Sequence, residues 1–346
     1  IVIPTTPIAA NPADGAESGV LRHPAFFFAI FPPMAGKKLP GILGKETPVP
    51  LRADRFGLSV ALSTPFNENR SIDLPRLVAH GRQSLADGCR SLTVFGTTGE
   101  GASLGLNERN RALGALVGAG VDPNTQLVVG IAAASVEEAI AQGRAGLMLG
   151  CPSFLLAPPF YFKSPGDEGL FDWFAAVLTG LGPKASNVIL YHIPQVTSVG
   201  LSVELIDRLK KAFPGQVKGV KDSSGHWNNT EALLKAHADL HILVGDERLL
   251  ARAMNLGASG TICGLANVAP DLMQAPVNGL EEPRIAAIIE LLLPYAVTAA
   301  VKALVGHRRN DPVAWSRMRA PLRSLNDAEC RALFAAVDAI RAKRAA

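Results

Sequence analysis

Residues 187–194 read Asn-Val-Ile-Leu-Tyr-His-Ile-Pro, and residues 217–222 read Val-Lys-Gly-Val-Lys-Asp. Both are short apolar runs of the kind that form buried strands. Between them, Ser202 precedes Leu205 and Leu209 at helical spacing, which predicts a helix that begins at this serine. A strand, a helix and a second strand in this order predict two parallel strands joined by a right-handed crossover.

The same alternation extends along the chain in both directions. Eight apolar runs with helical patterns between them occupy residues 57–63, 91–95, 126–131, 153–157, 187–193, 217–221, 241–244 and 260–263. An open doubly wound sheet and a closed barrel both fit this alternation, but a count of eight favours the barrel. No Gly-x-Gly-x-x-Gly follows the first run, which counts against a dinucleotide-binding fold. We therefore predict an α/β protein, a (β/α)8 TIM barrel with a C-terminal helical appendage.

Start and stop signals support the helices between the runs. Asp73 is expected to open the first helix, and Ser135 with Glu138 has the pattern of a capping box. Gly257 is expected to end a helix that runs from Asp246.

The chain divides into three predicted parts. Residues 1–50 form an irregular extension rich in Pro, Gly and Ala, whose single apolar run is too short to span a bilayer. Residues 51–275 form the barrel and residues 276–346 a set of helices packed on it. The expected C-terminal helices cover residues 282–305, 312–319 and 327–343, with a break at Pro321.

Composition excludes several classes of function. The net charge of +4 is mild, and no dense basic stripe with interleaved aromatics is present, so we expect no nucleic-acid partner and no membrane association. The four cysteines lie far apart, without a Cys-x-x-Cys or a nearby His at metal-ligand spacing. This argues against a zinc site and a disulfide framework, and buried free thiols point to a cytoplasmic protein.

Lys221 is the first candidate for chemistry. If Val217 and Gly219 point into the barrel, alternation makes Lys221 point inward too, at the strand end where barrels place their active sites. It is then either a structural lysine, paired with Asp222 or Glu100 or reaching the rim, or a nucleophile that attacks a carbonyl. The residues alone leave both interpretations open.

Other strand ends carry polar and aromatic side chains. Tyr191 is expected on the neighbouring strand at the height of Lys221, as an ordinary half-buried aromatic or as a proton shuttle, whereas His192 should face the helices. Residues 96–101 read Gly-Thr-Thr-Gly-Glu-Gly, either a plain turn or one whose amides and hydroxyls converge on a carboxylate. Residues 157–162, Ala-Pro-Pro-Phe-Tyr-Phe, form an aromatic loop that either packs simply or walls a pocket.

Together these strand ends resemble the dihydrodipicolinate synthase / N-acetylneuraminate lyase family. The matching stretches follow the family's order and intervals: Gly96–Glu100, Pro158–Tyr161, Tyr191–Pro194, Gly219–Asp222 and Gly245–Glu247. The resemblance implies a class I aldolase, a homotetramer or dimer of dimers, that has no metal or organic cofactor.

The resemblance also implies roles for individual residues. Lys221 would form an imine with pyruvate or a related 2-oxo acid, with Tyr191 as the proton shuttle. Thr97 would link Tyr191 to Tyr161, an aromatic residue that often comes from a neighbouring subunit in the family. Thr97 and Thr98 would hold the substrate carboxylate. The remaining implied substrate contacts are Gly99, Gly245 and Ile262.

One departure from the family concerns the second substrate. Dihydrodipicolinate synthases usually carry an arginine two residues after the Tyr-x-x-Pro proline, but here Pro194 is followed by Gln195 and Val196. Valine cannot make a bidentate contact with a carboxylate, so the lysine-biosynthetic reaction is not expected. His192 and the Asp-Ser-Ser-Gly at residues 222–225 are more similar to subgroups acting on sugar acids or other 2-oxo acids.

The sequence therefore predicts a Schiff-base-forming lyase or aldolase acting on pyruvate or a related 2-oxo acid. A 2-keto-3-deoxy sugar acid dehydratase or aldolase is the alternative within the same mechanism. A non-catalytic barrel that binds a small acid is an alternative of another class, although it would need neither nucleophile nor proton shuttle. A phosphate-binding barrel is a poor match, because residues 257–260 and 264–267 do not form a typical phosphate loop.

Overall fold

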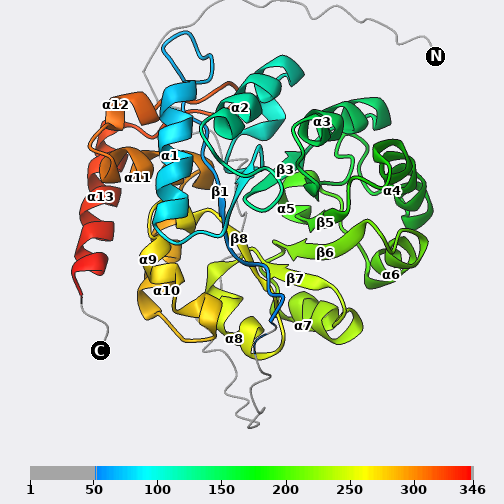
Figure 1. The fold of residues 1–346 in the computed structure, drawn as a ribbon. Coiled ribbons are helices and arrows are strands. Elements are labelled where there is room, and N and C mark those ends of the chain that lie inside the picture. The colour runs from blue at the N-terminus through cyan, green and yellow to red at the C-terminus, as the bar shows by residue number, and fades with distance from the viewer. Residues whose placement is uncertain (1–50, 52, 344–346) are drawn as a thin grey trace, which may run out of the picture.

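The computed structural model describes residue 51 and residues 53–343, so the extension predicted for residues 1–50 lies outside the described residues. Eight parallel strands form a closed barrel in sequence order, with β1 hydrogen-bonded to β8 (Figure 1). The strands are β1 (Gly57–Ala61), β2 (Ser91–Val94), β3 (Leu127–Ile131), β4 (Ser153–Leu156), β5 (Asn187–His192), β6 (Val217–Asp222), β7 (His241–Val244) and β8 (Gly260–Cys263). The predicted TIM barrel is confirmed.

Helices surround the barrel and connect its strands (Figure 1). The principal helices of the barrel are α1 (Leu74–Ala86), α2 (Leu106–Gly118), α3 (Val136–Met148), α4 (Asp167–Leu181), α6 (Val203–Ala212), α7 (Trp227–Ala236) and α8 (Leu250–Asn255). Shorter elements are η1 (Gly101–Ser103), α5 (Pro194–Thr197), η2 (Glu247–Leu249), η3 (Leu265–Asn267), α9 (Pro270–Met273) and η4 (Pro276–Asn278).

Three predicted helix starts are confirmed. The side chains of Asp73, Ser135 and Ser202 each accept a hydrogen bond from a backbone amide in the first turn of α1, α3 and α6. The capping box is only half formed, because Glu138 Oε1 accepts a hydrogen bond from Gln142 Nε2 instead. The helix expected from Asp246 to Gly257 is in fact η2 followed by the short α8.

Alternation of side chains divides the core into two layers. Ile189 and Tyr191 of β5 point into the barrel, whereas Val188 and Leu190 pack in the layer between strands and helices. Val217 was expected to share a face with Lys221 but packs in the outer layer. The register between β5 and β6 shifts by one residue between Val188 and Ile189, which accounts for this difference.

The C-terminal helices differ from the prediction. The single helix expected over residues 282–305 is two helices, α10 (Pro283–Leu292) and α11 (Val297–Arg308), bent by 117° because Pro294 interrupts the first. The helix expected over residues 312–319 is only α12 (Pro312–Trp315), and α13 (Asp327–Ala342) follows. Helices α11, α12 and α13 lie on the same side of the barrel as α1, and α10 lies beside α9 (Figure 1).

Helix α11 is buried along most of its length, from Thr298 to Gly306. Within the described residues, no single helix is long and apolar enough to cross a membrane, and α10 and α11 reach that composition only as the bent pair. The boundaries of the three predicted parts stay predictions.

Candidate active site

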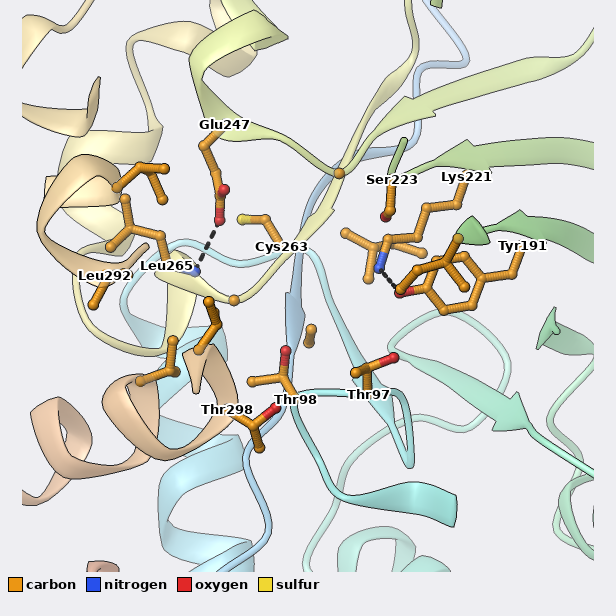
Figure 2. A pocket seen from close by; sticks show the side chains of 18 of the residues that line it. Thr97, Thr98, Tyr191, Lys221, Ser223, Glu247, Cys263, Leu265, Leu292 and Thr298 are labelled. Carbon is orange, nitrogen blue, oxygen red and sulfur yellow. Dashed lines mark hydrogen bonds between the residues drawn. The ribbon is translucent and has the colours of Figure 1, made fainter. Parts of the chain in front are cut away.

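Lys221 and Tyr191 meet inside the barrel at the carboxyl ends of β6 and β5. The register of the two strands pairs these residues directly. Lys221 Nζ donates a hydrogen bond of 3.2 Å to Tyr191 Oη and lies 4.3 Å from the centroid of its ring (Figure 2). Each residue is only 5% exposed.

The carboxylates that could have made Lys221 a structural lysine are engaged elsewhere. Asp222 accepts hydrogen bonds from Ser224 N and Thr230 Oγ1, at 2.9 and 2.7 Å. Glu100 forms an ion pair of 2.6 Å with Lys302 instead. Among the described residues, no carboxylate oxygen lies within 4.0 Å of Lys221 Nζ. The salt-bridged interpretation is therefore wrong, and the amine faces a phenol and an open cavity.

The cavity at Lys221 has a volume of about 60 Å³. Six of the eight residues proposed for the site line it: Thr97, Thr98, Tyr191, Lys221, Gly245 and Ile262 (Figure 2). Gly99 does not line it, but its carbonyl accepts a hydrogen bond from Thr64 Oγ1 at 2.7 Å. Tyr161 lies outside the cavity with 74% of its surface exposed.

The turn after β2 presents Thr97 and Thr98 because its backbone is tightly folded. Glu100 has a left-handed conformation, with φ at 55°, and its amide donates to Thr97 O at 3.1 Å. Gly101 N donates to Gly96 O, and a Cβ atom on Gly101 would lie 1.7 Å from Phe95 O. A Cβ atom on Gly99 would likewise lie 2.6 Å from Leu62 O, so the backbone requires glycine at both of these positions, whereas Gly96 has open space around it.

Ser223 and Glu247 are among the further residues that line the cavity, and the sequence had suggested no role for either. Ser223 follows β6, and its amide donates to His192 O at 2.9 Å. Glu247, after β7, is buried near Cys263, and its Oε1 accepts a hydrogen bond of 3.0 Å from Leu265 N (Figure 2). Burial raises the pKa of Glu247 to about 7. The signal for both was their position close to the carboxyl end of a barrel strand, one residue after β6 for Ser223 and three after β7 for Glu247.

A second, larger cavity of about 550 Å³ shares Thr97 and Tyr191 with the first. Gln195 and Val196 line it from α5, and Leu293, residues 295–298 and residues 319–322 line it from the C-terminal part. Two residues of the aromatic loop at residues 157–162, Ala157 and Phe160, also line this cavity. Gln195 Oε1 is buried and makes no hydrogen bond.

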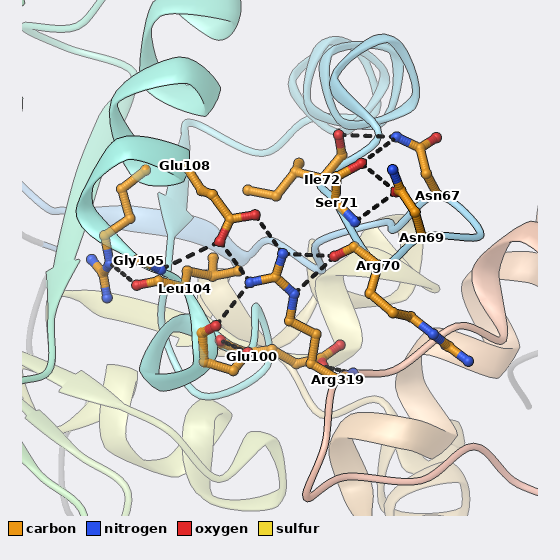
Figure 3. A network of polar contacts seen from close by, with 12 residues as sticks. Asn67, Asn69, Arg70, Ser71, Ile72, Glu100, Leu104, Gly105, Glu108 and Arg319 are labelled. Atoms are coloured by element: carbon orange, nitrogen blue, oxygen red, sulfur yellow. Dashed lines mark hydrogen bonds and ion pairs between the residues drawn. The ribbon is translucent and has the colours of Figure 1, made fainter.

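Arg319 is the single cation among the described residues that line the larger cavity. Its guanidinium is already engaged by Glu108, with which it forms an ion pair, and by the carbonyl oxygens of Arg70 and Ser103 (Figure 3). The larger cavity therefore offers a substrate uncharged polar groups rather than a free cation.

His192 lies outside both cavities, as expected. Its Nδ1 accepts a hydrogen bond of 2.9 Å from Leu201 N, and burial lowers the pKa of the imidazole. No group of three or more His, Cys, Asp or Glu side chains in the described part of the chain is arranged to hold a metal ion.

Similarity to known proteins shows which family this chain belongs to. Residues 54–338 match the Dihydrodipicolinate synthetase family. An uncharacterised DapA-like lyase of Chloroflexus aurantiacus is 33% identical over 299 residues, covering 84% of this chain and 98% of that protein. The chain belongs to the dihydrodipicolinate synthetase family.

Other relatives of the family carry more specific names. The 4-hydroxy-tetrahydrodipicolinate synthase of Pseudomonas aeruginosa is 30% identical over 265 residues, covering 75% of this chain and 86% of that protein. The structure of a dihydrodipicolinate synthase from Agrobacterium tumefaciens has a TM-score of 0.80 at 47% identity, covering 83% of this chain and 99% of that one. A 2-keto-3-deoxygluconate aldolase variant of Sulfolobus solfataricus, with a TM-score of 0.72 at 20% identity over 83% of this chain and 96% of that one, shares the fold.

Membership in the dihydrodipicolinate synthetase family confirms the resemblance seen in the strand ends. It also confirms the predicted function at the level of the family, a lyase built on a TIM barrel.

Proposed function

We propose that this protein is a Schiff-base-forming lyase that binds a 2-oxo acid covalently through Lys221 Nζ. The observation that carries the proposal is the contact of 3.2 Å between this buried amine and the Tyr191 hydroxyl, without a carboxylate partner for the amine among the described residues. A purely structural lysine at this depth would need an ion pair. A barrel that only bound small acids would need neither group.

The chemistry starts at the carbonyl carbon of the 2-oxo acid. The neutral amine of Lys221 adds to C2, and the carbonyl oxygen takes up a proton to give a carbinolamine. Loss of that oxygen as water forms the imine. Tyr191 is placed to move both protons, because its hydroxyl already contacts Nζ. The protonated imine then accepts the electron pair of a broken C3–H or C3–C4 bond as an enamine, so no further cofactor is needed.

The turn after β2 is suited to the substrate carboxylate. The hydroxyls of Thr97 and Thr98 line the same small cavity as Lys221 (Figure 2). A carboxylate held there would place C2 next to the amine. Holding the two reacting atoms close together accelerates the addition, as in an intramolecular reaction. Gly245 and Ile262 complete the lining of the proposed site, and Gly99 contributes through the backbone of the turn, where its carbonyl accepts a hydrogen bond from Thr64 Oγ1.

The larger cavity favours a substrate whose distal part is hydroxylated and uncharged, as in a 2-keto-3-deoxy sugar acid. The cation lining it, Arg319, is engaged by Glu108, and Gln195 Oε1 is buried without a partner. Gln195 nevertheless lines this cavity from α5 as an uncharged polar side chain. Val196 provides no ligand for a second carboxylate.

The assembly is part of the proposal. Tyr161 is too exposed to act within its own chain, so we place it in the relay of a neighbouring subunit in a homotetramer or dimer of dimers. Three of the four free cysteines are buried, in keeping with a cytoplasmic protein.

Reductive trapping tests the proposed function. The protein is incubated with pyruvate, 2-keto-3-deoxygluconate or another 2-oxo acid, reduced with borohydride and weighed intact by mass spectrometry. A stable adduct of one acid per chain is expected. Failure of every 2-oxo acid to form an adduct would overturn the proposal.

A further inference from the structure

Glu100 ties the turn after β2 to the C-terminal part of the chain. Its side chain is fully buried, and both carboxylate oxygens have partners more than 200 residues away. Oε1 accepts a hydrogen bond of 2.6 Å from Lys302 Nζ. Oε2 accepts one of 3.0 Å from the backbone amide of Arg319.

Lys302 approaches Glu100 from helix α11 and is itself buried. Its Nζ also donates to Arg317 O at 2.7 Å and lies 4.1 Å from the centroid of the Phe66 ring. Burial lowers the pKa of Lys302 to about 8. A buried charge left without its partner is strongly unfavourable, so each of the two side chains holds the other in place.

Arg319 binds the residues that follow the same turn in the chain. Its guanidinium binds Glu108 of α2 (Figure 3) and donates to the carbonyl of Ser103 in η1. The turn that presents the two threonines is therefore held from outside the barrel by α11 and by the segment after α12.

The turn transmits the position of Glu100 to the threonines. The amide of Glu100 donates to Thr97 O, so a shift of Glu100 displaces the residue that lines both cavities. Helix α11 also supplies Thr298 to both cavities, which makes it a wall of the site as well as the source of Lys302.

We propose that Lys302 is a positioning residue. Through its ion pair with Glu100 it fixes the Thr97–Thr98 turn, so that the turn receives the carboxylate of the 2-oxo acid within reach of Lys221. The C-terminal helices then complete the active site rather than only covering the barrel. This inference rests on the proposed function of Lys221 and the threonines.

The test compares Lys302→Met with Arg308→Met. Arg308 lies on the same helix and binds Asp87 and Val268 O, at a distance in the fold from the turn, so it controls for the loss of a cation from α11. The readout is the pyruvate concentration that gives half-maximal borohydride trapping, together with the maximal extent of trapping. Lys302→Met should raise that concentration roughly tenfold, the effect of one weakened hydrogen bond to a charged group, at an unchanged maximal extent.

A second variant covers the case in which Lys302→Met does not fold. Glu100→Gln combined with Lys302→Met removes both charges, leaves an oxygen for Arg319 N, and should raise the half-maximal concentration in the same way. An unchanged concentration in a folded variant, or an equal rise in Arg308→Met, would overturn the positioning role. Absence of any adduct in the wild-type protein would instead reject the proposed function.

Discussion

Tyr191 Oη accepts a hydrogen bond of 3.2 Å from Lys221 Nζ across two neighbouring strands whose register pairs these residues directly. Both side chains are buried, so few other groups can exchange protons with the amine. The arrangement assigns two separable tasks: Lys221 forms the bond, and Tyr191 moves the protons.

Tyr191→Phe should slow imine formation by roughly 10²- to 10⁴-fold, the usual contribution of a positioned proton donor and acceptor. The final extent of trapping should stay close to that of the wild type, because the amine remains. Quenching the reaction with borohydride at increasing times measures both quantities. Wild-type rates in this variant would remove Tyr191 from the mechanism.

The second substrate gives a separate prediction. Condensation of pyruvate with aspartate semialdehyde should be slow, because Val196 lines the larger cavity where an arginine would be needed. Val196→Arg should raise that rate about tenfold by providing a hydrogen-bonded charge. Val313→Arg, at an exposed valine of α12, is the matched control. Fast turnover of aspartate semialdehyde by the wild type would show that another group binds its carboxylate.

Gly101→Ala should disrupt the turn after β2. A Cβ atom there would lie 1.7 Å from Phe95 O, a backbone atom that cannot move aside. The expected loss in unfolding free energy is on the order of 3 kcal/mol, with loss of trapping. Gly105→Ala, where a Cβ meets nothing within 4 Å, should cost no more than about 1 kcal/mol. Similar melting of the two variants would contradict this account of the turn.

Glu247→Gln should remove a pH dependence of folding stability. Burial raises the pKa of Glu247 from 4.5 to about 7, so the folded protein keeps a proton that the unfolded chain has lost. Below pH 4.5 this carboxyl is protonated in both states and does not lower the free energy of unfolding. As the pH rises, the free energy of unfolding falls because of this group, by roughly 3 kcal/mol above pH 7.

Urea unfolding at about pH 5 and pH 8 measures this difference. From pH 5 to pH 8 the free energy of unfolding of the variant should rise by roughly 2 kcal/mol relative to that of the wild type, because all other titrating groups are shared. A constant difference between the two proteins would mean that Glu247 is ionised in the folded state over the whole range.

Local patterns were sufficient to predict the barrel and the two facing residues of the site. Strand ends, caps and the inward direction of Lys221 depend on neighbouring residues, and alternation along β5 placed Tyr191 correctly. Alternation failed for Val217 because the register shift between β5 and β6 arises from pairing between strands.

Contacts between distant residues could not be predicted in this way. Asn267 was considered only as part of a poor phosphate loop, yet its amide donates to Ala61 O and Gly264 O and accepts from Ser63 N. The Glu100–Lys302 pair joins residues 202 positions apart, and its sequence signal is two ordinary charged residues. Such pairs become visible only when the fold brings the elements together.

The central claim is tested most directly by locating the trapped adduct. After reduction with pyruvate and borohydride, peptide mass spectrometry compares the wild type with Lys221→Arg and with Lys218→Arg, a lysine of the same strand whose Nζ contacts Pro214 O. The adduct should lie on the peptide at Lys221, persist in Lys218→Arg and be absent from Lys221→Arg. An adduct on another residue, or one that survives in Lys221→Arg, would contradict the account.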